Sequence, residues 1–211
     1  MINFLNKKHI IILVSGGAAS GKTTFSEKLM KLVKNYSVSL VSLDNYYKDF
    51  PNLSSEELKN INFDNPITID SKLLLKHINM LINDKIVKQP KYDFSINAHG
   101  NEYVIVKPAK IIIIEGIFLL EMKEIRNLSN IKIYIETDDD IRFIRRLNRD
   151  IKERKRSEEF AIKQYLEKVK PMHELIVKPS SRYADLIIPY YEGNDVAMEI
   201  LISSIKGLLN K

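Results

Sequence analysis

Apolar residues cluster in two kinds of segment along this chain. Five short runs are rich in isoleucine, valine and leucine, and strands rich in these residues without regular polar alternation are typical of a parallel sheet buried on both faces. These runs are Ile10–Val14, Val38–Leu43, Ile111–Ile114, Ile131–Ile135 and Leu186–Ile188. Helical patterns lie between or after them, near 21–34, 69–83, 120–127, 139–151, 158–176 and 195–209. This alternation predicts an α/β fold, with a parallel sheet flanked by helices on both faces.

Residues 86–108 interrupt the alternation. They contain Pro90, Gly100 and Pro108 between β-prone pieces, which predicts a β-hairpin insertion between a helix and a strand. Ligands of open α/β sheets bind at the carboxyl ends of the strands. The hairpin is therefore either a wall of a substrate site or a surface decoration, and the sequence leaves both readings open.

Length and composition set further bounds. A chain of 211 residues is expected to form a single domain over residues 1–211. No apolar run approaches the roughly 18 residues of a membrane span and no export signal is evident, so we expect a cytoplasmic protein that binds no membrane. The absence of cysteine excludes disulfides and thiol chemistry. Four scattered histidines lack metal-ligand spacing and are expected to be structural or surface residues: His9, His77, His99 and His173.

Residues 16–23 match G-x-x-x-x-G-K-[ST], the phosphate-binding loop, between a predicted strand and a predicted helix. The backbone N–H groups of such a loop cradle phosphates at a helix N-terminus. Lys22 is placed to reach the terminal phosphates, and the Thr23 hydroxyl to hold Mg²⁺. The alternative is a glycine-rich turn that binds nothing, and the flanking elements favour the loop. The predicted nucleotide-binding residues are Gly16, Gly17, Ala18, Ala19, Ser20, Gly21, Lys22, Thr23 and Thr24.

Two acidic residues end predicted strands. Asp44 follows the second strand, where it could take a proton from an attacking hydroxyl, help to hold Mg²⁺, or merely cap a turn. Glu115 closes the third strand, in the place of the metal-side acid of phosphate-loop proteins, and could also simply end a buried strand. Both fall at the edge of the sheet where the phosphates are expected.

The net charge of +6 is concentrated between Arg142 and Arg156, where eight basic residues face two acids. At helical spacing, arginines occupy one face and isoleucines and leucine another. Arginine suits bidentate phosphate contacts, so we favour a phosphate clamp, with residues 142–157 as a lid, over a solvated charged face. The arginine face consists of Arg142, Arg145, Arg146 and Arg149 and continues into Arg154-Lys155-Arg156, and the apolar face consists of Ile141, Ile144, Leu147 and Ile151. Asp138–Asp140, at the start of this helix, are read as capping residues.

Several ordered motifs resemble those of uridine–cytidine kinases, within the group that includes phosphoribulokinase and pantothenate kinase. The resemblance covers residues 11 to about 208. It is carried by Gly-Gly-Ala-Ala-Ser-Gly-Lys-Thr-Thr (16–24), Asp-Asn-Tyr-Tyr (44–47), Asn-Phe-Asp-Asn-Pro (62–66), Tyr-Asp-Phe (92–94), Glu-Gly-Ile (115–117), Arg-Arg-Leu-Asn-Arg-Asp-Ile-Lys-Glu-Arg (145–154) and Lys-Pro-Ser-Ser-Arg-Tyr-Ala-Asp (178–185).

The resemblance implies a fold, an activity and roles for single residues. It implies a phosphate-loop kinase with an arginine-rich helical lid that moves a phosphoryl group from ATP or GTP to the 5′-hydroxyl of uridine, and of cytidine as a second substrate. It also implies Mg²⁺ and a homotetramer. Asp44 resembles the catalytic base, Asp64 the ribose-binding carboxylate and Arg149 its partner on the sugar. Further implied contacts are Tyr47, Tyr92, Phe94, Ile117 and Gln164 for the nucleoside, Glu115 for the metal, and Arg146, Arg154 and Arg156, with Lys22, for the phosphates.

Three positions depart from the pattern of these kinases. Asn97 stands where histidine often contacts the pyrimidine, which leaves base preference open, with His99 as a substitute if the loop shifts. Asn65 stands where histidine is common, and Lys155 replaces a usual glycine in the lid. Other readings remain: a related small-molecule kinase acting on pantothenate or a sugar phosphate, a regulatory GTPase, for which the Asn-Lys-x-Asp segment is missing, and a nucleic-acid-binding module. We expect no nucleic-acid partner.

Overall fold

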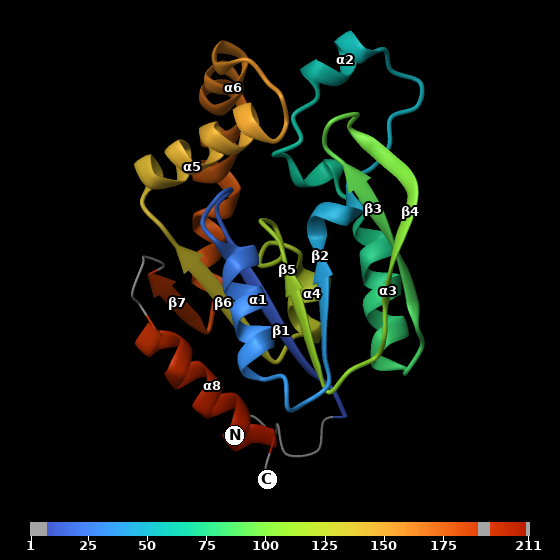
Figure 1. The fold of residues 1–211 in the computed structure, drawn as a ribbon, viewed down its shortest axis with the longest axis vertical. Coiled ribbons are helices and arrows are strands. Elements are labelled where there is room, and N and C mark those ends of the chain that lie inside the picture. The colour runs from blue at the N-terminus through green and yellow to red at the C-terminus, as the bar shows by residue number, and fades with distance from the viewer. Residues whose placement is uncertain (1–7, 190–194, 210–211) are drawn as a thin grey trace.

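The computed structural model describes residues 8–189 and 195–209, and these form a parallel five-stranded sheet with helices on both faces (Figure 1). The strand order is β2-β5-β1-β6-β7. All five strand predictions are confirmed, as β1 (Ile10–Gly16), β2 (Val38–Ser42), β5 (Ile111–Glu115), β6 (Ile131–Glu136) and β7 (Leu186–Pro189). The predicted second strand loses its last residue, because Leu43 begins the 3₁₀ turn η1 (Leu43–Tyr46).

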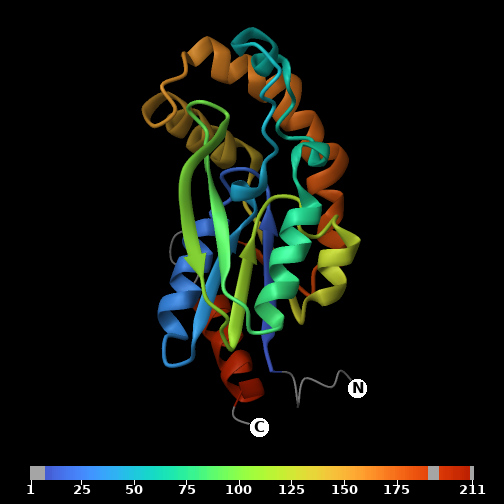
Figure 2. The same ribbon diagram turned by 90° about the vertical axis from the view of Figure 1, so that its right-hand side faces the viewer.

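Two apolar layers hold the sheet between its helices. Alternate residues of β1 point to opposite faces, Ile10, Ile12 and Val14 to one and Ile11 and Leu13 to the other. One face packs on α1 (Lys22–Leu32) and α8 (Asp195–Leu209), and the other on α3 (Ser71–Ile82) and α4 (Lys123–Leu128) (Figure 2). Strands covered on both faces explain why the sequence shows continuous apolar runs. None of the described helices is long and apolar enough to span a membrane.

The predicted hairpin is confirmed as β3 (Val87–Asp93) paired antiparallel with β4 (Ala98–Val106). A register shift between Pro90 and Tyr92 marks a bulge, consistent with a proline that cannot donate to the ladder. The hairpin rises beside β2 and α3, and its tip lies over the carboxyl ends of the strands (Figures 1 and 2). It is therefore placed as a wall of a site and not as a remote decoration.

Short helices complete the carboxyl-end face of the sheet. The sequence reading missed α2 (Ser55–Asn60), although Ser54 and Glu57 form a capping box that announces it. The predicted helix 158–176 is α6 (Glu158–Gln164), α7 (Lys170–Met172) and two π-helical turns, η3 (Tyr165–Val169) and η4 (His173–Val177). Pro171 has no N–H for an α-helical bond, and the wider turns on either side accommodate it. The 3₁₀ turns η2 (Pro66–Thr68) and η5 (Pro179–Tyr183) complete the elements.

Helix α5 (Asp139–Lys152) buries part of its arginine face and exposes its isoleucine face. Its arginine side is packed, with Arg142 and Arg146 buried, whereas Ile141, Ile144 and Ile151 are at least 37% exposed. The helical spacing separated these two faces but did not say which of them is buried. The arginine face is buried because carboxylates inside the protein form ion pairs with it, as described below. At the N-terminus, Asp138 makes no side-chain capping bond.

Candidate active site

The phosphate loop joins β1 to α1 and leaves its backbone open toward the carboxyl end of the sheet. Gly21 has φ 94° at the N-cap of α1, a left-handed conformation that suits glycine. The hydroxyl of Thr137 donates to the carbonyl oxygen of Ser20 at 2.9 Å and ties the loop to the end of β6. The ammonium of Lys22 donates to the carbonyl oxygen of Gly17 at 3.1 Å. Lys22 thus folds back over an anion cradle at a helix N-terminus.

The acids predicted for the strand ends meet the phosphate loop. The Thr23 hydroxyl lies 3.4 Å from a carboxylate oxygen of Glu115, and the Ser42 hydroxyl donates to the other oxygen. Burial raises the pKa of Glu115, and the nearby Asp44 adds to the rise. Burial lowers the pKa of Lys22, against the opposing effect of Glu115 and Asp44.

These groups fit a magnesium ion. Thr23 and Glu115 offer a hydroxyl and a carboxylate, the hard oxygen donors that Mg²⁺ prefers. Glu115 is only 3% exposed, and burial raises its pKa because the charged carboxylate is poorly solvated. A divalent cation beside it would stabilise the charged carboxylate. The residues that would hold the ion are therefore the two that the sequence indicated.

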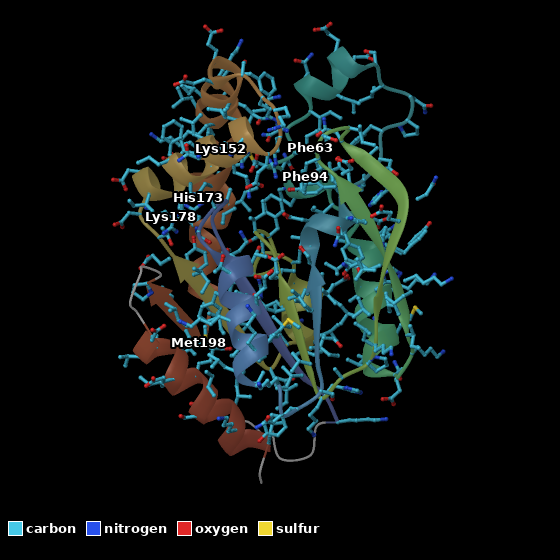
Figure 3. All side chains as sticks on the ribbon, viewed as in Figure 1. Phe63, Phe94, Lys152, His173, Lys178 and Met198 are labelled. Atoms are coloured by element: carbon cyan, nitrogen blue, oxygen red, sulfur yellow. The ribbon has the colours of Figure 1, made fainter. Side chains whose placement is uncertain are left out.

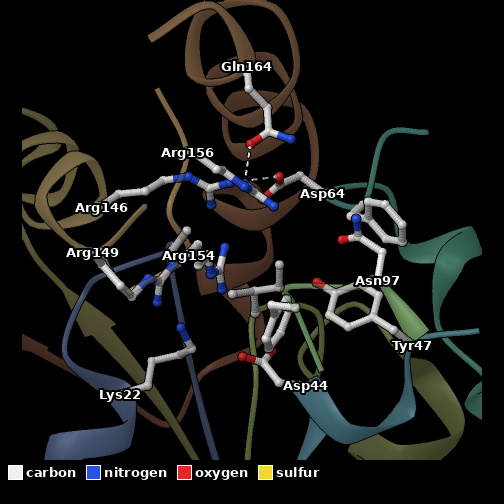
Figure 4. Close-up of a pocket in the computed structure, with 15 residues that line it drawn as sticks. Lys22, Asp44, Tyr47, Asp64, Asn97, Arg146, Arg149, Arg154, Arg156 and Gln164 are labelled. Atoms are coloured by element: carbon white, nitrogen blue, oxygen red, sulfur yellow. Dashed lines mark hydrogen bonds and ion pairs between the residues drawn. The ribbon is translucent and has the colours of Figure 1, made fainter. Parts of the chain in front are cut away.

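A cleft runs from the phosphate loop to the hairpin tip (Figure 4). Its aromatic wall is formed by Tyr47, directly after η1, by Phe63, in the segment before η2, and by Phe94 of the hairpin. Tyr47 lies 5.3 Å from Tyr92 and 5.9 Å from Phe94 between ring centroids. The hydroxyl of Tyr92 is buried and has no hydrogen-bond partner within the described part of the chain. Tyr92 therefore supports the aromatic wall from behind Tyr47 and Phe94, and it is not among the residues that line the cleft.

The cleft collects most of the residues singled out from the sequence. It is lined by Ala18, Ala19, Lys22, Asp44, Tyr47, Phe63, Asp64, Phe94, Asn97, Ile117, Arg146, Arg149, Arg154, Arg156 and Gln164. Phe63 is the member that received no role from the sequence, although it lies in the Asn-Phe-Asp segment. Asn97 lies on the cleft with φ 50°, a backbone conformation that asparagine tolerates at a tight turn. His99 faces Asp49 and Asn45 instead.

Asp64 is a nearly buried carboxylate at the far end of the cleft. Its side chain is 13% exposed and lies 3.4 Å from the guanidinium of Arg146. The ion-pair partner of Asp64 is Arg146, and the implied role of Arg149 beside Asp64 on the sugar hydroxyls stays a prediction. Arg149 lies near Lys22 (Figure 4), and its positive charge contributes to lowering the pKa of Lys22.

A carboxylate that the sequence reading did not assign organises the lid. Asp150 is 1% exposed, and its oxygens lie 3.1 to 4.0 Å from nitrogens of the arginines of the cleft. These are Arg146, Arg149, Arg154 and Arg156. A single acid inside an arginine-rich stripe is the signal that could have identified it, because buried charges are paired. Asp150 therefore balances part of the positive charge of these four arginines, which the sequence analysis had assigned to contacts with phosphate.

The lid arginines also contact the aromatic wall of the cleft and Gln164. The guanidinium of Arg154 lies 4.2 Å from the centroid of the Phe94 ring, a cation–π contact. Arg156 donates to the side-chain oxygen of Gln164 at 2.7 Å. Burial lowers the pKa of Arg154 to about 10. Lys155, between them, has φ 55°, the left-handed conformation that a glycine would adopt more easily.

Arg142 leaves the stripe and lies behind the phosphate loop. Its Nε donates to the carbonyl oxygen of Thr137 at 3.1 Å, and it pairs with Asp139. A Cβ on Gly17 would lie 2.6 Å from the terminal nitrogen of Arg142 and 3.0 Å from His173, so any larger residue there would displace the Arg142 guanidinium. Figure 3 shows His173 and Lys178 on this side of the molecule. Arg145 is exposed, and neither Arg142 nor Arg145 lines the cleft described above.

The sheet order, the phosphate loop and the lid define the class, a phosphate-loop kinase. The sequence pattern of the Phosphoribulokinase / Uridine kinase family matches residues 11–197. The uridine kinase of Clostridium tetani is 46% identical over 207 residues, 98% of this chain and 99% of that protein. The uridine kinase of Anoxybacillus flavithermus is 42% identical over 207 residues, 98% of each. The chain belongs to the phosphoribulokinase/uridine kinase family. Phosphoribulokinase from Rhodobacter spheroides, 13% identical, superposes with a TM-score of 0.62 over 90% of this chain and 74% of that one, and shares the fold.

Proposed function

We propose that this protein is a uridine kinase, which transfers the γ-phosphoryl group of ATP or GTP to the 5′-hydroxyl of uridine, with cytidine as a second substrate. The observation that carries the proposal is the cleft itself, in which Lys22 and Asp44 face an aromatic pocket that ends at Asp64. A phosphate cradle, a proton acceptor and a pocket for a flat base with a sugar are the parts that nucleoside phosphorylation requires. Relatives at 46% and 42% identity that are named uridine kinases support it.

In this proposal the nucleoside lies along the aromatic wall. Its base packs against Tyr47 and Phe94, with Asn97 at the polar edge, and its ribose hydroxyls bind Asp64 and Arg146. The 5′-hydroxyl then points to Asp44, which accepts its proton as the oxygen attacks the phosphoryl group in line. A carboxylate as the sugar contact accounts for ribose recognition, because each ribose hydroxyl can donate to it.

The donor phosphates occupy the loop of residues 16–24. Lys22 and the arginines of the cleft neutralise the charge that develops on the transferring group. Thr23 and Glu115 would hold Mg²⁺, which supplies charge neutralisation at the phosphate oxygens when bound. The lid covers the cleft and excludes water, which would otherwise compete with the ribose hydroxyl as the nucleophile.

The cellular setting follows from this activity. We place the protein in the cytoplasm, where it returns free pyrimidine nucleosides to the nucleotide pool by salvage. A homotetramer would cover the apolar side chains that β4 exposes, namely Tyr103 (61%), Val104 (43%) and Ile105 (52%). Light scattering of the purified protein reports the assembly directly.

Initial rates with a nucleoside panel test the proposal. The panel contains uridine, cytidine, thymidine, adenosine and guanosine, each with Mg-ATP or Mg-GTP, with pantothenate and ribulose 5-phosphate as competing acceptors. We expect UMP as the main product, and Lys22→Met as a folded, inactive control. Phosphorylation of pantothenate or ribulose 5-phosphate in place of every nucleoside would overturn the assignment.

A further inference from the structure

His99 joins the hairpin to the segment that carries Asp44. Its Nδ1 lies 3.0 Å from a carboxylate oxygen of Asp49, and its Nε2 lies 3.1 Å from the carbonyl oxygen of Asn45. Its backbone N–H donates to the second oxygen of Asp49 at 2.8 Å. These contacts join residues about 50 positions apart in the sequence. They are separate from the β3–β4 ladder, which pairs the two hairpin strands only with each other.

Both partners of the ring are hydrogen-bond acceptors. A neutral imidazole carries one N–H and one lone pair, so it can satisfy only one of these oxygens and must turn a lone pair toward the other. An imidazolium donates to both. The side chain is 20% exposed, so the proton can exchange with solvent.

The position of the ring connects it to nucleoside binding. His99 pairs with Tyr92 across the hairpin, and the two rings meet edge to face with centroids 5.3 Å apart. The side-chain oxygen of Asn45 also accepts from the backbone N–H of Tyr92 at 3.2 Å. Asn45 follows Asp44, and His99 lies two residues after Asn97. The His99 ring therefore links the segment that carries Asp44 to the hairpin segment that carries Asn97.

We propose that His99 is a positioning residue which, as an imidazolium, clasps the hairpin onto the Asp44 segment and makes nucleoside binding weaken as pH rises. This inference rests on the proposed function. Deprotonation removes one of the two donors and frees the hairpin wall, while the phosphate loop and Asp44 keep their contacts. The expected effect is on the KM for uridine, with the KM for ATP unchanged.

Other charged groups around the clasp do not replace it. His99 and Asp49 lie in a surface groove that is also lined by Lys48, Asp70, Lys72, His77, Lys88 and Tyr103. Burial lowers the pKa of His77, which is hydrogen-bonded to Tyr46 at 3.0 Å and is not in contact with Asp49 or Asn45 in the described contacts. Burial raises the pKa values of Tyr46, Tyr47 and Tyr92, which keeps these phenols protonated. Asp49 is the carboxylate in contact with the His99 ring.

The experiment measures the KM for uridine and for ATP between about pH 6 and about pH 8.5, the range in which histidine changes charge. For the wild type we expect the uridine KM to rise roughly three- to tenfold, the worth of one net hydrogen bond. His99→Arg, a permanent cation, should keep a low uridine KM at both ends. His99→Gln should show a raised KM at both ends. Asp49→Asn should also lose the pH dependence, and His9→Gln, at the far end of the sheet, should behave as wild type.

A second measurement does not depend on activity. ¹⁵N NMR of the labelled protein reports whether both ring nitrogens of His99 carry protons at about pH 6, and hydrogen exchange reports protection of residues 92–99 with pH. A neutral His99 ring, or a uridine KM with the same pH dependence in His99→Gln as in the wild type, would overturn the clasp. A protonated ring in a protein that phosphorylates no nucleoside would overturn the proposed function and leave the clasp as a structural contact only.

Discussion

Replacing Asp150 with asparagine isolates the charge that holds the lid together. The substitution preserves the shape of the side chain but removes the negative charge from among the lid arginines. The guanidinium nitrogens of Arg154, Arg146, Arg156 and Arg149 lie 3.1, 3.5, 3.5 and 4.0 Å from its oxygens. At an effective dielectric constant of about 20, one such pair at about 3.5 Å attracts by roughly 5 kcal/mol before desolvation and arginine–arginine repulsion are subtracted.

The net loss follows from how far each arginine can escape to water. Breaking a buried ion pair by removing one partner costs about 3–5 kcal/mol. The side chains of Arg149, Arg154 and Arg156 are 33%, 14% and 15% exposed and can turn outward, and Arg146 keeps Asp64. We therefore expect the lower end, a loss of about 3 kcal/mol in the free energy of unfolding and a fall in Tm of about 6–12 °C.

Urea unfolding monitored by circular dichroism measures this loss, and hydrogen exchange measures protection of residues 146–157. Glu153→Gln is the matched control, because Glu153 is exposed, three residues away, and loses the same charge. Mg-ATP with uridine should recover part of the loss in Asp150→Asn, since phosphate then neutralises the arginines. A loss below about 1 kcal/mol, no larger than that of Glu153→Gln, would refute the role of Asp150 as the centre of the lid.

Four further predictions concern the cleft. Asp44→Asn should cut kcat by about 10²–10⁴ and leave ATP binding intact, as steady-state kinetics and calorimetry can show; near-wild-type turnover would remove Asp44 as the base. Asp64→Ala should raise the KM for uridine far more than the KM for ATP, by the roughly 1.5–3 kcal/mol of a charged hydrogen bond, and equal efficiency of the wild type on uridine and deoxyuridine would contradict the assignment. Asn97→His should shift the uridine-to-cytidine efficiency ratio, because the amide of asparagine can both donate and accept; an unchanged ratio would place base reading elsewhere. Residues 150–157 should gain hydrogen-exchange protection with an ATP analogue and nucleoside, and Arg154→Lys and Arg156→Lys should lower turnover with little change in nucleoside affinity; exchange indifferent to nucleotide, with normal turnover in both variants, would show a merely solvated face.

Local patterns in the sequence were enough to predict the strands of the sheet and the hairpin. The central strands β1 and β5 are nearly unbroken apolar runs because both of their faces are covered by helices. The phosphate loop was recognisable from its local pattern of glycines, with Gly21 in the left-handed conformation just before Lys22. The hairpin was visible through its prolines and glycine. The boundaries that failed, at Leu43 and near Pro171, are places where a turn competes with a strand or helix over one or two residues.

The partners of the charges came only from tertiary structure. Periodicity placed arginines and isoleucines on separate faces of α5, but it could not say which face turns inward, because that depends on carboxylates distant in sequence or hidden in the stripe itself. Asp64 lies 82 residues from Arg146, and Asp150 is one of two acids among eight basic residues between positions 142 and 156, where only the fold shows that it is buried. Likewise, His99 was one histidine of four until folding set its two ring nitrogens against Asp49 and Asn45. Sequence determines which elements form through near-neighbour geometry, whereas the burial of charge is decided by contacts that exist only once the chain has closed around them.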